Sequence, residues 1–433
     1  MHDNEEFCIS VEGISKIEGH ASLDVKVKKG KVIDAKLRIN ENKRFNTLAT
    51  IGKPALAVHQ IVSRICGTCS VAHLLCCIKC VENALGFEPS KQTIKLRDLM
   101  LYGLNIRDHA MHLFFFSLPD IFGKDSVLDF ADTGKEHDLL HKALAIKTAG
   151  NNLSVLIGGR AVHPPNILVG GFSKILTPDE AKKMVKELKS IRPFVLEFID
   201  IFYKSDFEFI TETTFIALRN DRFSYLEGDL ISSDGTRIEE NDLLEHLNKF
   251  VLPYSQAAGF SFKGKPYTVG ALARMNLNKD ALHPKTQVSA AKYLDVFPSD
   301  NMFHNNLAQA IEILHAIDSS IQSLEENEFK VESRPAIVPK KSHGIGVIEA
   351  PRGTLYYNLR IDDAGKIEWA DLVIPTAQNQ IKIDKDIGIL VQQKLDKKMS
   401  RDKIPFELEK LIRAYDPCMS CATHFLKVNW KEE

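Results

Sequence analysis

Residues 416–424 read Asp-Pro-Cys-Met-Ser-Cys-Ala-Thr-His, a Cys-x-x-Cys pair followed by a histidine. A second pair lies near the start of the chain, in residues 64–73, which read Arg-Ile-Cys-Gly-Thr-Cys-Ser-Val-Ala-His. Thiolates arranged in two such pairs are typical metal ligands. We therefore expect the chain between them to be a scaffold that brings Cys66, Cys69, Cys418 and Cys421 onto one metal centre.

The composition is that of a large globular protein. The chain has 433 residues, of which 44% are hydrophobic and 26% charged, and its formal net charge of −1 gives no sign of nucleic-acid binding. No signal peptide is expected, because the acidic first residues lack a basic segment followed by an apolar one. No stretch approaches the roughly 18 apolar residues of a membrane span. Clustered thiols in such a chain favour metal or redox chemistry over disulfides, and we expect a cytoplasmic protein.

Hydrophobic periodicity predicts an α+β chain that is mostly helical, with a bundle of long helices and peripheral β-hairpins. Alternating apolar residues predict strands over 6–12 and 21–39 and a hairpin over 354–374. No repeat or Pro/Ser-rich linker interrupts the chain, so residues 1–433 are expected to form one intertwined domain. The predicted helices lie at 53–63, 71–85, 93–116, 136–152, 178–203, 302–324, 383–393 and 405–414.

Three polar or thiol-rich features remain open at this level. Cys76, Cys77 and Cys80 share a helix with the first cysteine pair, and we interpret them as buried apolar thiols of the core. The polar stretch 107–112 is either a salt-bridged helix contact or part of the site. The glycines at 344–346 lack the strand-to-helix context of a nucleotide-binding loop.

The distance between the two cysteine pairs limits which metal they hold. Structural zinc usually closes a small module whose pairs lie about 15–20 residues apart. These pairs are separated by nearly the whole chain, which excludes a compact zinc ribbon. A long-range structural zinc site, an iron–sulfur cluster and a nickel–iron site all remain compatible with four thiolates.

Taken with their flanking residues, the two pairs resemble the large, catalytic subunit of the nickel–iron hydrogenases, and the resemblance covers the whole chain. Further stretches also look like family motifs, in family order. They are Lys16-Ile17-Glu18-Gly19-His20, Gly158-Gly159-Arg160-x-x-His163-Pro164, Ala271-x-Ala273-Arg274, Glu349-Ala350-Pro351-Arg352-Gly353 and Pro375-Thr376-x-x-Asn379.

The resemblance implies a metal centre and a reaction. Cys66 and Cys418 would be terminal nickel ligands, while Cys69 and Cys421 would bridge nickel to an iron that carries cyanide and carbon monoxide. The family's reaction is the reversible heterolysis of H2 into a hydride and a proton, run in either direction. Cys418 would take the proton and Glu18, which on its own would be read as a surface residue, would pass it outward.

The resemblance also implies residues around the centre. Arg352 would lie over the open metal position, with Asp108 and Asp416 pairing with its guanidinium. Pro351 would line the diatomic ligands of the iron. His73 would hydrogen-bond a bridging sulfur and tune it.

Two features depart from the family pattern. Many members carry a glutamate that binds magnesium or iron together with the C-terminal histidine, here His424. The corresponding stretch of this chain ends in Asn46, and an amide is a poorer ligand for a hard dication, so we expect this third site to stay empty. The family also loses a C-terminal peptide after that histidine to a maturation endopeptidase, which makes residues 425–433 a candidate removable tail.

The expected partners follow from what the chain lacks. It has no spare four-cysteine cluster motif, so electrons would leave through a separate iron–sulfur small subunit, followed by further electron-transfer subunits. Two other classes of protein are the alternatives. One is a structural zinc protein, and the other resembles the quinone-site subunit of respiratory complex I, which shares the fold but has lost the cysteines.

Overall fold

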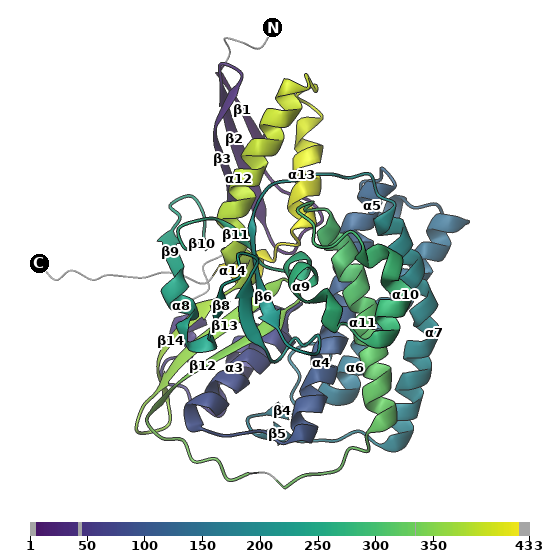
Figure 1. Cartoon of the computed structure of the whole chain (residues 1–433). Helices are drawn as coiled ribbons and strands as arrows, with labels where there is room; N and C mark the ends of the chain where they lie inside the picture. Colours follow the sequence, from purple (N-terminus) through teal and green to yellow (C-terminus); the bar gives the residue numbers. More distant parts are fainter. Residues whose placement is uncertain (1–5, 42–45, 334, 424–433) are drawn as a thin grey trace, which may run out of the picture.

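Long helices form one flank of the molecule (Figure 1). The computed structural model describes residues 6–41, 46–333 and 335–423. Within this part the predicted long helices are confirmed, and they pack against one another as a bundle. The bundle consists of α4 (Lys91–Ala110), α6 (Lys135–Gly158), α7 (Pro178–Tyr203) and α11 (His304–Glu326).

The start of α7 shows how local sequence sets these boundaries. Thr177 accepts a hydrogen bond from the Glu180 backbone nitrogen, and the Glu180 carboxylate accepts one from the Thr177 nitrogen. Pro178 occupies the first helical position, where no hydrogen bond is lost. At the other end of the bundle, α4 continues as a π-helical segment, Met111–Ser117, before α5 (Leu118–Ile121). Such widened turns often lie at functional sites.

A three-stranded antiparallel sheet lies beside the bundle, in the order β12-β13-β14, and α3 (Ser70–Leu85) covers it. The helix comes unusually close to β12, because a Cβ atom on Gly346 would lie 2.7 Å from the Cys80 nitrogen and 2.8 Å from the Cys76 oxygen. The glycines at 344–346 are therefore packing residues. The strands are β12 (Ser342–Ala350), β13 (Gly353–Ile361) and β14 (Ile367–Val373).

Replacing Gly346 by alanine is expected to destabilise the chain by about 2 kcal/mol, the usual cost of overpacking a dense core. The added methyl group would push against helix backbone, which cannot turn away as a flexible side chain can. The measurement is the chemical-denaturation midpoint. Gly388→Ala is the matched control, because a Cβ atom there meets only ordinary contacts, the nearest at 3.6 Å. Equal midpoints for both variants would contradict the close α3–β12 packing.

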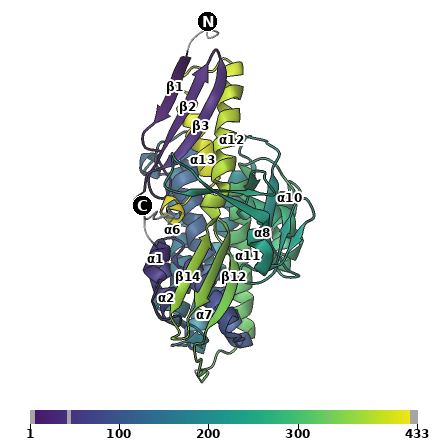
Figure 2. The same cartoon turned by 90° about the vertical axis from the view of Figure 1, so that its left-hand side faces the viewer.

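The N-terminal sheet, in the order β1-β2-β3, stands against α12 at one end of the molecule (Figures 1 and 2). Its hairpin is the one predicted over 21–39. Helices α12 and α13 run next to each other and deliver the chain to α14, which lies near the middle of the molecule (Figure 1). These elements are β1 (Glu6–Val11), β2 (Ala21–Lys28), β3 (Lys31–Ile39), α12 (Pro375–Asp396), α13 (Ile404–Ala414) and α14 (Met419–Ala422).

The segment between α7 and α11 holds a second sheet, in the order β11-β6-β7-β8, and the pair β9-β10. Its strands are β6 (Thr214–Arg219), β7 (Asp229–Ser232), β8 (Arg237–Ile238), β9 (Leu247–Val251), β10 (Ala258–Phe262) and β11 (Tyr267–Thr268). The remaining short elements are α1 (Asn46–Thr50), α2 (Val58–Val62), α8 (Leu243–His246), α9 (Ala271–Asn278), α10 (Pro284–Leu294), β4 (Ile167–Leu168) and β5 (Gly171–Phe172).

The structure differs from the sequence prediction in a few elements. Strand β12 was not predicted, and neither were α9 and α10. Helix α12 begins eight residues before the predicted 383, at Pro375, and the helix expected over 53–63 is reduced to α2 after a series of turns. Across the described ranges, no helix has the length and apolar character needed to cross a membrane.

Candidate metal centre

The four paired cysteines converge at one buried point. Their sulfurs all lie within 4.8 Å of one another, and each residue is at most 4% exposed. The sulfur of Cys69 is 2.8 Å from that of Cys421, which is also 2.8 Å from that of Cys418. Cys66 and Cys418 are 3.4 Å apart. The predicted joining of the two distant pairs is thus what the fold produces.

Three backbone contacts bring the C-terminal pair to this point. The Cys418 nitrogen donates to the Thr376 hydroxyl at the start of α12, over 2.9 Å. The Met419 nitrogen donates to the Glu18 carbonyl oxygen over 3.0 Å, as part of a short bridge between Glu18 and Cys418. The chain therefore anchors its last motif on the segment that follows β1.

The donor set fits a soft or borderline transition metal. Burial raises the pKa values of the Cys418 and Cys421 thiols well above normal, while the hydrogen bond with Cys418 lowers that of Cys66. Four buried thiolates this close would repel one another strongly without a cation. A bound metal cation removes that penalty, and the described residues contain no other group of three or more metal-ligating side chains.

Glu18 lies directly on the centre. Its Oε2 accepts hydrogen bonds from the Cys418 sulfur at 3.1 Å and from the Ser420 nitrogen at 3.0 Å. The residue is neither fully buried nor exposed. It therefore stands between the thiols and the surface, as a group that exchanges protons with Cys418 would need to.

Arg352 follows β12 and shares a small cavity with Cys69, Cys418 and Cys421. Its Nη1 donates to Asp108 Oδ2 at 2.7 Å and its Nη2 donates to Asp416 Oδ1 at 2.8 Å. The polar stretch 107–112 is therefore part of the site, as one of its two interpretations held. Among the described residues, the buried Arg352 Nε has no hydrogen-bond partner.

A second buried arginine holds the loop that carries Arg352. The guanidinium of Arg274 pairs with Glu312 at 2.7 Å and with Glu349 at 2.8 Å. It also donates to the backbone oxygens of Ala350 and Pro351, at 3.0 and 2.9 Å. Two sequence motifs, one around residue 274 and one around residue 351, thus act together to fix this loop.

His73 lines the same small cavity as the cysteines. Its Nδ1 shares a hydrogen bond of 2.8 Å with the hydroxyl of Tyr357 on β13, a partner that the sequence did not suggest. Burial lowers the pKa of His73 to about 4, so the ring is neutral at pH 7. The predicted contact with a bridging sulfur stays a prediction.

The other thiols of α3 belong to the core, as predicted. Cys76, Cys77 and Cys80 are buried, and Cys76 and Cys80 donate to backbone oxygens of β12. The two residues considered for a third metal site, His424 and the side chain of Asn46, lie outside the described residues.

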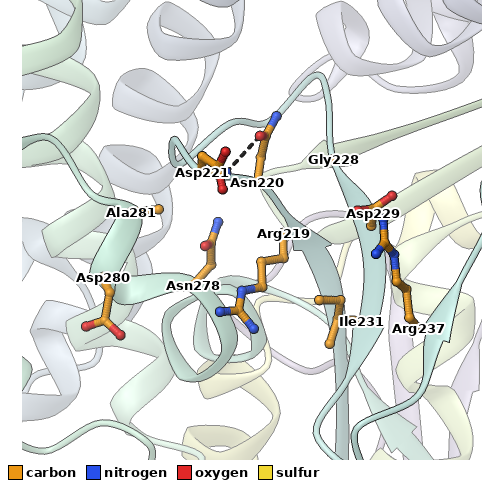
Figure 3. A pocket seen from close by; sticks show the side chains of 10 residues that line it. All are labelled: Arg219, Asn220, Asp221, Gly228, Asp229, Ile231, Arg237, Asn278, Asp280 and Ala281. Carbon is orange, nitrogen blue, oxygen red and sulfur yellow. Dashed lines mark hydrogen bonds and ion pairs between the residues drawn. The ribbon is translucent and has the colours of Figure 1, made fainter.

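A surface pocket of about 730 Å³ is separate from this centre. Figure 3 shows its mixed lining, with Arg219 and Asn278 on one side and the paired Arg237 and Asp229 on the other. None of the predicted site residues lines it. Its opposed charges select no obvious class of ligand.

Buried thiols with a carboxylate at 3.1 Å and an arginine in the same cavity define a thiolate-ligated metalloenzyme. The family model of the nickel-dependent hydrogenases matches residues 48–142 and 229–424. The chain belongs to this family. It is the catalytic large subunit of a nickel–iron hydrogenase, an oxidoreductase that acts on H2.

Individual relatives agree with this assignment. The alpha subunit of sulfhydrogenase 2 of Pyrococcus furiosus is 32% identical over 97% of this chain and 100% of its own length. A subunit of the F420-non-reducing hydrogenase vhu of Methanocaldococcus jannaschii is 28% identical over 88% of this chain and 97% of its own. Neither the quinone-site subunit nor the structural zinc protein finds support.

Solved structures share the fold. A NAD+-reducing NiFe-hydrogenase in the H2-reduced state superimposes with a TM-score of 0.84 at 23% identity, over 97% of this chain and 100% of that one. A Ni-Fe-Se hydrogenase from D. vulgaris Hildenborough gives a TM-score of 0.78 at 22% identity, with the same coverage. The predicted α+β hydrogenase fold is thereby confirmed.

Proposed function

We propose that Cys66 and Cys418 are terminal nickel ligands and that Cys69 and Cys421 bridge the nickel to an iron that carries cyanide and carbon monoxide. The closest sulfur pairs support this assignment, because Cys421 lies 2.8 Å from both Cys69 and Cys418. When bound, the nickel–iron centre supplies the heterolysis of H2. The protein residues around it hold the metals and move the proton.

Glu18 is the proton acceptor in this proposal, and the observation that carries it is the 3.1 Å hydrogen bond from the Cys418 sulfur to Glu18 Oε2. A proton released at the Cys418 sulfur then needs no rearrangement to reach the carboxylate. The Ser420 nitrogen holds the same oxygen in place.

Arg352 provides a fixed positive charge beside the reaction site, because a guanidinium does not lose its proton in the accessible pH range. Asp108 and Asp416 position it from two sides. Pro351 lines the diatomic ligands of the iron, and His73 hydrogen-bonds a bridging sulfur. The shared cavity of His73, Arg352 and three of the cysteines supports these roles.

Electrons leave through an iron–sulfur small subunit, followed by further electron-transfer subunits. The described residues support this, since they contain no second group of metal ligands that could form a cluster. The relatives are themselves subunits of hydrogenases. We infer that residues 1–433 act as a single domain within such an assembly in the cytoplasm.

The third metal site is proposed to stay empty, because Asn46 offers an amide where magnesium or iron prefers a carboxylate. His424 alone would be a weak ligand for such an ion. A maturation endopeptidase acting after His424 would remove residues 425–433.

Metal analysis of the purified complex tests the proposal. We expect one nickel per large subunit, iron in at least equal amount once small-subunit clusters are counted, and infrared bands of bound cyanide and carbon monoxide. Zinc in the four-cysteine site with no such bands would contradict it. The matched control is the same complex from cells grown without nickel, which should lose H2 uptake and nickel together.

A further inference from the structure

His112 is buried behind the Arg352 ion pairs, with hydrogen-bond acceptors at both ring nitrogens. Its Nε2 lies 2.7 Å from the backbone oxygen of Arg413, and its Nδ1 lies 2.6 Å from Gln309 Oε1. A backbone carbonyl oxygen can only accept, so Nε2 must carry a proton. Ser117 Oγ lies farther away, at 3.3 Å, and does not change this requirement.

The neighbouring carboxylate fixes the orientation of the Gln309 amide. Gln309 Nε2 donates to Asp416 Oδ2 at 2.8 Å, while Asp416 Oδ1 accepts from Arg352. Turning the amide over would place its oxygen against a carboxylate oxygen, and both would be acceptors. Gln309 Oε1 therefore faces His112, and Nδ1 must carry a proton as well.

The charges around the ring agree with a cation at this position. Arg352 faces two carboxylates, Asp108 and Asp416, which leaves the cluster one positive charge short. His112 Nδ1 lies 3.9 Å from Asp416 Oδ2, close enough to supply that charge in a buried site.

The other charged groups on the surrounding elements already have partners. Glu312 of α11 pairs with Arg274. The side chain of Arg413 on α13 turns to Asp120, with which it forms two hydrogen bonds of 2.7 and 2.9 Å. None of these groups would replace the charge of His112.

We propose that His112 is a buried imidazolium at neutral pH and that it acts as a positioning residue. Through Gln309 it holds Asp416 in place, and Asp416 in turn holds Arg352 over the metal centre. The consequence for turnover rests on the role proposed above for Arg352, whereas the charge of the ring does not. As pH rises, the ring loses a proton, Gln309 loses its donor, and the contact to Asp416 loosens.

The charge is tested directly by solid-state 15N NMR of the assembled complex, with the ring nitrogens of histidine labelled in this chain. We expect one buried ring to show two protonated nitrogens at pH 7, and its signal to disappear in His112→Phe. His59 is the internal control, because burial lowers its pKa to about 4 and its ring should be neutral. A His112 ring with a single proton at pH 7 would overturn the proposal.

The positioning role is tested by the pH dependence of H2 uptake. Gln309→Met keeps the volume of the side chain but removes both amide contacts. We expect roughly 10–100-fold lower turnover with unchanged nickel content, as for other residues that orient a metal site indirectly. The alkaline loss of activity expected for the unaltered enzyme should also become weaker.

Ser117→Ala is the matched control, since it removes the more distant neighbour of Nε2 and should leave both turnover and its pH dependence unchanged. An unaltered pH profile in Gln309→Met would overturn the positioning role. If the unaltered complex had no H2 uptake at all, the proposed function would fail, but the NMR measurement would still decide the charge of His112.

Discussion

Replacing Glu18 by glutamine is expected to lower H2 turnover by roughly 10²–10⁴-fold, the contribution usual for a positioned general acid or base. Glutamine has the size of glutamate but does not take up a proton. It also presents an NH2 group or a neutral oxygen to two donors, the Cys418 thiol and the Ser420 nitrogen. The thiol ligands are untouched, so the nickel content should remain normal.

The measurement combines H2 uptake with an artificial electron acceptor, nickel analysis, and exchange of D2 with solvent protons. Exchange should fall together with uptake, because both need the proton to leave Cys418. Glu12→Gln is the control, since Glu12 is an exposed carboxylate on the same N-terminal segment. Normal turnover in Glu18→Gln would remove Glu18 from the mechanism.

The local part of the centre could be predicted from sequence. A Cys-x-x-Cys spacing places two thiols on one turn, and the apolar residues after Cys69 predict the helix that the pair precedes. The capping residues of α7 likewise indicate its start. Each of these signals lies within a few neighbouring residues, where backbone geometry is short-range.

Contacts between distant segments left no such signal. Glu18 meets Cys418 across 400 residues of chain, and on its own pattern it reads as a surface glutamate. Gln309 is an amide on an amphipathic helix, and nothing in its neighbours indicates that it holds Asp416. Thr376 lay within a recognised motif, but its contact with the Cys418 nitrogen depends on the fold.

Strand β12 was missed for a related physical reason. Its last seven residues are all buried, because α3 covers one face and other chain segments cover the other. A strand buried on both faces does not alternate between apolar and polar residues, and its glycines look like a turn. The glycines instead allow the close approach of α3, a requirement that is visible only once both elements are in place.

Replacing Cys421 by serine is expected to remove the metals and, with them, essentially all activity. Its sulfur lies 2.8 Å from both Cys69 and Cys418, so it is the thiol with the closest contacts in the centre. A serine oxygen is a harder donor, is not ionised at neutral pH, and is a poor ligand for nickel and low-valent iron. We expect nickel to fall at least about tenfold, in line with the loss of an inner ligand where even indirect contacts are worth 10–100-fold.

Cys80→Ser is the control that gives this experiment its meaning. Cys80 belongs to the third Cys-x-x-Cys of the chain, is fully buried, and donates to the Gly344 oxygen, which a serine hydroxyl can also do. Because its sulfur is absent from the four-thiol group, nickel and turnover should stay near normal. Metal loss in Cys80→Ser equal to that in Cys421→Ser would mean that substitution of any buried thiol disrupts the fold. Loss in Cys421→Ser alone assigns the effect to ligation, because the two variants make the same chemical change at equally buried positions.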